Sequence, residues 1–166
     1  MQTQTILFAV FSALSVFLAV AGRRGLFAVL QKRPGKRILW YLPAFLALGV
    51  VLSTVFSTSS ELTLSPFVLV RVLVLTPISE EFIFRGGLLL CPRFLLRKSR
   101  YARVFTVLLL FFSAAAFALV HAVGQPMLHA FWMGLCLGAA ALSENSLWCS
   151  VILHAAWNAL CVLLLI

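Results

Sequence analysis

Three separate apolar stretches of the chain carry side chains that could act together on an amide bond. Glu80 and Glu81 lie in one stretch, and His121 ends a second. His154 and Asn158 lie in a third. A carboxylate can act as a general base toward water, an imidazole can transfer a proton, and neutral donors can stabilise an oxyanion. These residue types therefore predict hydrolysis of an amide by an activated water molecule.

Helical spacing separates the roles of the two carboxylates. Because residues four apart share a helix face, Glu81 is predicted to pair with Arg85. Glu80 lies on a different face and has no partner from its own turn, so it is the predicted base. Phe117 lies one turn before His121 and is expected to fix the orientation of its ring.

The remaining residues of the predicted site have expected roles around the same water molecule. His121 is expected to position the water and to pass a proton to the leaving amine. His154 and Asn158 point the same way from one helix, which gives two donors for an oxyanion. Pro77 removes a backbone donor shortly before Glu80, so we expect a kink that admits water near the carboxylate.

The composition places these residues in a membrane. The chain has 166 residues, of which 63% are hydrophobic and 10% charged, and its mean hydropathy is +1.12. Soluble domains average about 25% charged residues. We therefore predict an all-α polytopic transmembrane helix bundle forming a single membrane-embedded domain over residues 1–166. About six spans are expected, at residues 5–22, 38–56, 64–91, 103–121, 127–142 and 147–165.

The basic residues cluster in the predicted loops. Of the 13 Lys and Arg residues, six lie in residues 23–37 and five in residues 93–103. The positive-inside rule then predicts a multi-pass protein of the cell membrane with cytoplasmic basic loops and an outside N-terminus. Since these charges mark topology, no nucleic-acid partner is predicted. The expected partners are the lipid bilayer and a membrane-anchored or exported protein or peptide substrate.

Three motifs in this order resemble those of a known family. They are EExxxR at 80–85, FxxxH at 117–121 and HxxxN at 154–158. Together they are similar to the motifs of the CPBP family, which comprises CAAX proteases and bacteriocin-processing (Abi) intramembrane endopeptidases. The resemblance covers about residues 64–160 and implies a CAAX-endopeptidase-like core.

The resemblance also implies a glutamic-type intramembrane protease, and it carries the roles over by position. Glu80 would be the base, supported by Glu81 and Arg85. The second motif supplies His121, and the third supplies the oxyanion donors His154 and Asn158. Only two spans precede the first motif, unlike in the larger CAAX enzymes, which puts a prenylated substrate in doubt. Short relatives include proteases resembling the myxosortases, which trim C-terminal sorting signals of exported proteins.

Several alternatives stay open. A divalent metal such as zinc could be held by Glu80, His121 and His154, although Asn158 and a paired Glu81 suit a metal-free scheme better, so no cofactor is expected. A proton-coupled transporter also needs buried ionisable groups. A noncatalytic membrane immunity or binding protein could keep the same fold. Replacing Glu80 with Gln should separate these classes.

Overall fold

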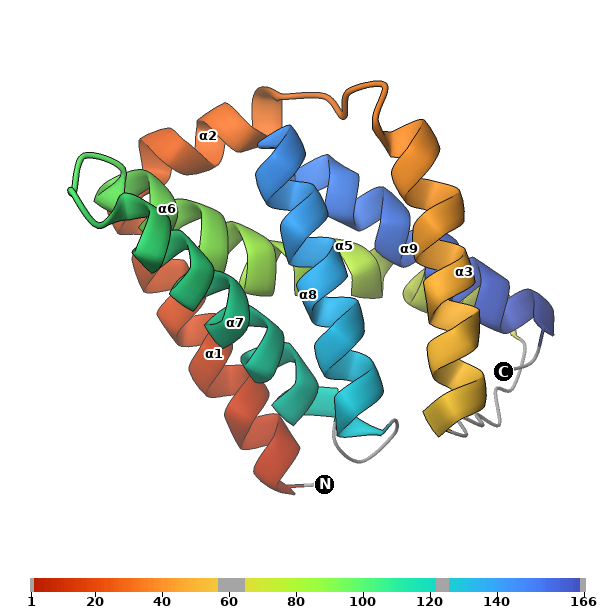
Figure 1. Ribbon diagram of the computed structural model, residues 1–166. Helices are drawn as coiled ribbons and strands as arrows, with labels where there is room; N and C mark the ends of the chain where they lie inside the picture. The colour runs from red at the N-terminus through yellow and green to blue at the C-terminus, as the bar shows by residue number, and fades with distance from the viewer. Residues whose placement is uncertain (1, 57–64, 122–125, 165–166) are drawn as a thin grey trace.

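The computed structural model describes residues 2–56, 65–121 and 126–164, and within these ranges every regular element is a helix (Figure 1). The predicted all-α class is confirmed. The elements in chain order are α1 (Gln2–Ala21), α2 (Arg23–Gln31), α3 (Ile38–Phe56), α4 (Pro66–Val70), the π-helix η1 (Arg71–Leu75), α5 (Thr76–Glu81), the π-helix η2 (Phe82–Leu90), α6 (Cys91–Leu96), α7 (Ala102–His121), α8 (Met127–Glu144) and α9 (Leu147–Leu164).

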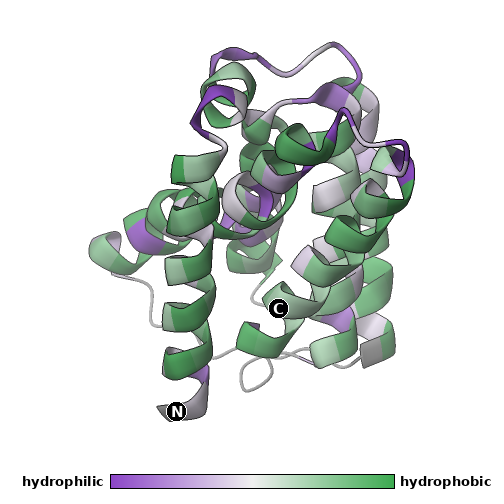
Figure 2. Cartoon of the chain, turned by 90° about the vertical axis from the view of Figure 1, so that its left-hand side faces the viewer, coloured by the Kyte–Doolittle hydropathy of each residue, from purple (hydrophilic) through white to green (hydrophobic). Residues whose placement is uncertain are grey.

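Five of these helices are long and apolar enough to cross a membrane: α1, α3, α7, α8 and α9. They agree with five of the six predicted spans to within a few residues. Large apolar side chains cover their outer faces, with Phe17 69% and Trp40 79% exposed. Figure 2 shows hydrophobic colour along the helix bodies and hydrophilic colour gathered at the loops of one end. Since water would disfavour so much exposed apolar surface, these faces fit lipid, and the chain is a membrane protein.

The remaining predicted span, residues 64–91, corresponds to a segmented helix. Helical structure runs without a break from Pro66 to Leu96, but two π-helical segments, η1 and η2, interrupt the α-helical register. Such segments are rare and occur frequently at functional sites. Pro77 is the second residue of α5, just after η1, and has no backbone N–H, so it disturbs the register without ending the helix. This segmented helix carries the first motif.

The loops in the structure are shorter than the loops predicted from the sequence. The basic segment 23–37 contains helix α2, the segmented helix extends to Leu96, and α8 extends to Glu144. In α2, two arginines precede a short apolar segment, and this masks its helical pattern in the sequence. Gly25 lets α2 approach α6 closely, because an added Cβ would overlap the ring of Phe94.

Helix α8 occupies the centre of the bundle (Figure 1), with α7 and α1 on one side and α3 on the other. Gly134 lets it approach α7 closely, because an added Cβ there would lie 3.2 Å from the Cα of Ala114. Small residues allow such contacts between membrane helices. The segmented helix lies mainly against α1, α7 and α9 and also contacts α2 and α8, so its buried residues face several other helices.

Candidate active site

Three helices bring Glu80, His121 and His154 together. Glu80 lies near the end of α5, His121 is the last residue of α7, and His154 lies in α9. The Oε2 atom of Glu80 is 3.5 Å from His121 Nε2 and 3.8 Å from His154 Nε2. The side chains are 12%, 22% and 8% exposed, respectively. The three groups are thus shielded but not sealed off.

The other ring nitrogen of each histidine is already hydrogen bonded. His121 Nδ1 donates to the backbone carbonyl of Phe117 over 2.8 Å. His154 Nδ1 donates to Oε1 of Glu81, also over 2.8 Å. Because a carbonyl and an ionised carboxylate only accept, each ring carries its proton on Nδ1. In the neutral rings Nε2 is therefore an acceptor, and both Nε2 atoms face Glu80.

The two neighbouring carboxylates have different surroundings. Glu81 Oε1 is 2.9 Å from Arg85 Nη1, and both side chains are fully buried. This is the pair predicted from the spacing of four residues. In contrast, Glu80 Oε2 is buried without a hydrogen-bond partner in the part of the chain that the structure describes. Since buried polar atoms normally have a partner, Glu80 is open to an incoming donor.

Arg85 connects the first motif to two other helices. Its Nη2 donates to the carbonyl of Gly134 in α8 over 3.2 Å, and its Cζ lies 4.5 Å from the centre of the Phe117 ring in α7. Together with its ion pair to Glu81, these contacts hold the guanidinium from three directions. Arg85 therefore fixes the position of Glu81, and Glu81 in turn holds the His154 ring.

Phe117 packs between the two imidazoles. The Phe117 and His121 ring centroids are 4.2 Å apart with an interplanar angle of 31°, as expected from their spacing. The His154 ring approaches the same phenyl group edge-on at 5.8 Å. This packing restricts rotation of both imidazoles, so their Nε2 atoms stay directed at Glu80.

Asn158 contacts the backbone of the segmented helix. Its Nδ2 donates to the carbonyl of Val72 in η1 over 2.9 Å. In η1 the N–H of Thr76 bonds to the carbonyl of Arg71, five residues earlier. The next bond in this register would join Pro77 to Val72, but proline has no N–H. Asn158 thus supplies the donor that Pro77 lacks.

The structure does not bring His154 and Asn158 onto one common acceptor. His154 bonds to Glu81, and Asn158 bonds to Val72. The oxyanion role of these two residues therefore stays a prediction. Asn158 has one further N–H for such a role while its bond to Val72 is intact.

Loss of the Asn158 amide is expected to destabilise the protein through Val72. Replacing Asn158 with Ala should lower the free energy of unfolding by about 0.6–2 kcal/mol, the range of hydrogen bonds between membrane helices. Replacing Pro77 with Ala in the same chain restores a backbone N–H and should recover part of this loss. Unfolding of both variants in detergent micelles measures the effect. An equal loss with and without Pro77→Ala would contradict the proposed contact.

Sequence reasoning missed Ser113. Its hydroxyl donates to the carbonyl of Phe84 in η2 over 2.7 Å, and the serine is buried in α7. Both π-helical segments therefore have a carbonyl bonded to a side chain of another helix. Ser113 lies four residues before Phe117, so the shared helix face was the signal that could have identified it.

The comparison with protein families agrees with this geometry. Residues 62–160 match the family described as Type II CAAX prenyl endopeptidase Rce1-like. The chain belongs to the CAAX protease family. The match contains all three motifs and the core segment expected from the resemblance. At family level this CAAX protease is an intramembrane endopeptidase, which indicates a membrane-embedded peptide as substrate. No curated protein and no solved structure matches the chain.

Proposed function

We propose that this CAAX protease hydrolyses a peptide bond in or near a membrane-associated segment, with Glu80 as the general base. The observation that supports the proposal most strongly is the position of Glu80 Oε2. It is buried without a hydrogen-bond partner among the described residues and faces two Nε2 atoms at 3.5 and 3.8 Å. A general base must lie within reach of the water that it activates.

A water molecule would complete the hydrogen bonding of these three groups. Glu80 Oε2 and the two Nε2 atoms are all acceptors when the rings are neutral, so they need a donor between them. Water has two O–H donors. In the proposed step one proton passes to the Glu80 carboxylate, and the oxygen attacks the carbonyl carbon of the peptide bond.

The same groups can return the proton to the leaving amine. When the tetrahedral intermediate collapses, the C–N bond breaks and the amine nitrogen takes up a proton. His121 is the most exposed of the three side chains, at 22%. We assign it to carry the proton from Glu80 to the amine, while its bond to Phe117 holds the ring in place.

The oxyanion needs donors, and His154 can become one. A His154 ring that has taken up a proton from solvent at Nε2 before the reaction is an imidazolium, which Glu81 can stabilise through the existing 2.8 Å bond to Nδ1; the attacking water is then held by Glu80 and His121. The free N–H of Asn158 is the second candidate donor. Loss of one oxyanion donor typically lowers the rate about 10²–10³-fold.

The proposed mechanism uses no metal ion. The alternative places zinc between Glu80, His121 and His154, where it would help to ionise the attacking water. Among the described residues no group of three or more His, Cys, Asp and Glu is arranged to hold a metal ion. We expect purified, metal-analysed protein to keep its activity after treatment with a chelator. A loss of activity that added zinc restores would favour the alternative.

The proposed substrate is a membrane-anchored or exported protein, and the proposed cleavage includes removal of a C-terminal sorting signal from such a protein. The proposed topology places the N-terminus outside and the basic loops in the cytoplasm of a cell-membrane protein. A noncatalytic immunity or binding protein and a proton-coupled transporter are the alternatives. The Glu80→Gln substitution separates them. A binding or immunity protein would keep its phenotype with this change, whereas a transporter would lose its pH-dependent flux.

Mass spectrometry of protein termini tests the proposed function. Membrane and secreted fractions are compared between cells with the wild-type chain and cells with the Glu80→Gln variant. We expect new termini in or next to an apolar segment only when Glu80 is intact. Identical sets of termini at equal protein levels would contradict the proposal.

A further inference from the structure

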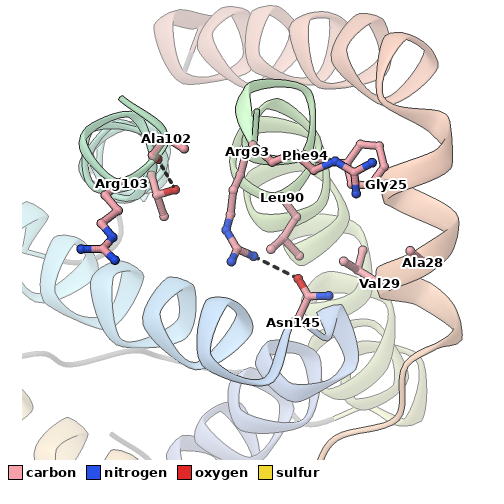
Figure 3. A pocket seen from close by; sticks show the side chains of 11 residues that line it. Gly25, Ala28, Val29, Leu90, Arg93, Phe94, Ala102, Arg103 and Asn145 are labelled. Carbon is pink, nitrogen blue, oxygen red and sulfur yellow. Dashed lines mark hydrogen bonds between the residues drawn. The ribbon is translucent and has the colours of Figure 1, made fainter. Parts of the chain in front are cut away.

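A cavity lies far from the candidate active site. It has a volume of about 430 Å³ and is bounded by α2, α6, the start of α7 and the turn between α8 and α9 (Figure 3). His121 ends α7, whereas Arg103 of this cavity lies in the first turn of the same helix. The volume is within the range of sites for small ligands.

The cavity concentrates positive charge. Arg93, Arg97 and Arg103 line it, and no carboxylate does. None of the three guanidinium groups forms an ion pair with any residue that the structure describes. Three uncompensated cations around one cavity favour a bound anion. The planar donor array of arginine matches phosphate oxygens in particular.

The arginine side chains are held at the cavity. Figure 3 shows Arg93 reaching to Asn145, and its Nη1 donates to Oδ1 of that residue over 3.0 Å. Asn145 ends α8 in the left-handed conformation, with φ 49° and ψ 41°, and asparagine tolerates this conformation well. The Arg97 guanidinium lies 4.0 Å over the ring of Phe94. Two of the three cations are thus oriented before any ligand binds.

The remaining wall is apolar. Val29, Leu90 and Phe94 line it beside the arginines. The elements that bound the cavity, among them α2 and the turn between α8 and α9, lie at one end of the bundle (Figure 1), next to the apolar bodies of the long helices. An amphiphile with a phosphate headgroup fits this combination, because the charge meets the arginines and the first part of an acyl chain meets the apolar wall. Basic pockets between membrane helices bind anionic lipid headgroups in this way.

We propose that this cavity binds a phosphate group, and that its amphipathic lining selects the headgroup of an anionic phospholipid. The binding site is separate from the peptidase site and does not depend on the proposed reaction. Free inorganic phosphate has the same chemistry but makes no use of the apolar wall.

Lipid binding to the purified protein tests this proposal. The full chain is placed in nanodiscs of phosphatidylcholine with or without phosphatidylglycerol, and bound lipid is measured by native mass spectrometry after release. A variant with Arg93→Gln and Arg103→Gln loses two of the cavity's charges. The matched control with Lys98→Gln and Arg100→Gln loses the same charge outside the cavity, from exposed positions of the neighbouring turn. Inorganic phosphate is tested separately as a competitor.

We expect the wild type and the control to retain phosphatidylglycerol, and the cavity variant to bind it at least about tenfold more weakly. If phosphate alone competes fully at millimolar concentration, the phosphate site is supported with a soluble anion as its ligand. No preference for phosphatidylglycerol over phosphatidylcholine would overturn the proposal. So would equal losses in both variants, which indicate general surface attraction. If the double variant does not fold, Arg97→Gln, at an exposed position, provides the same comparison.

Discussion

Replacing Glu80 with Gln is expected to reduce peptide cleavage about 10²–10⁴-fold, the usual contribution of a general base. The amide of Gln has nearly the same shape as the carboxylate but cannot accept the proton of the attacking water. Because Glu80 Oε2 has no hydrogen bond to any described residue that the change would break, the fold should persist. Initial rates on a labelled peptide in detergent measure the effect, with substrate binding followed in parallel.

The matched control is Glu144→Gln. In the described ranges Glu144 is the buried carboxylate that lies outside the first motif. Its Oε2 accepts a hydrogen bond from the backbone N–H of Gly35 over 2.8 Å. A glutamine side chain keeps an acceptor oxygen there, so this variant should cleave at close to the wild-type rate. Retained cleavage by Glu80→Gln would refute the role of Glu80. A loss of both cleavage and substrate binding would instead show that Glu80 holds the substrate.

Contacts within one helix were predictable because helical geometry alone sets them. The pairing of Glu81 with Arg85 and the packing of Phe117 on His121 both follow from a spacing of four residues. The separation of Glu80 from this pair follows from the same geometry. These local relations located the candidate site before any packing of helices was known.

Contacts between helices were not predictable in detail. His154 was expected to act with Asn158, yet in the structure it bonds to Glu81 in α5. The bond of Arg85 to the Gly134 carbonyl requires α8 to lie beside η2. The spacing of residues within one helix does not determine how that helix is rotated relative to another. The partners of these side chains therefore depend on the assembled bundle.

The fold shows the same division. Long apolar spans were predicted closely because about 20 apolar residues must cross the bilayer. The π-helical segments were not, since they depend on donors from other helices as well as on Pro77. Asn158 and Ser113 each supply a hydrogen bond to a π-segment carbonyl, and both come from distant parts of the chain. A local change of register is thus stabilised by tertiary contacts.

Removal of the Arg85 guanidinium is expected to have the largest effect on stability. In an Arg85→Met variant Glu81 loses its ion pair and the carbonyl of Gly134 loses a donor, while both side chains of the original pair are fully buried. Breaking a buried pair by removing one partner costs about 3–5 kcal/mol, because the other charge stays buried without compensation. Equilibrium unfolding in mixed micelles measures the loss.

Two further variants separate charge from packing. Combining Arg85→Met with Glu81→Gln removes the uncompensated charge but keeps an acceptor for His154, so this double variant should be more stable than Arg85→Met alone. Arg71→Met is the matched control, since Arg71 is exposed in the same segmented helix and forms no ion pair with a described residue. It should change the free energy of unfolding by less than about 1 kcal/mol. If Arg85→Met were no less stable than Arg71→Met, the buried pair could not be what holds Glu81, and through it His154, beside Glu80.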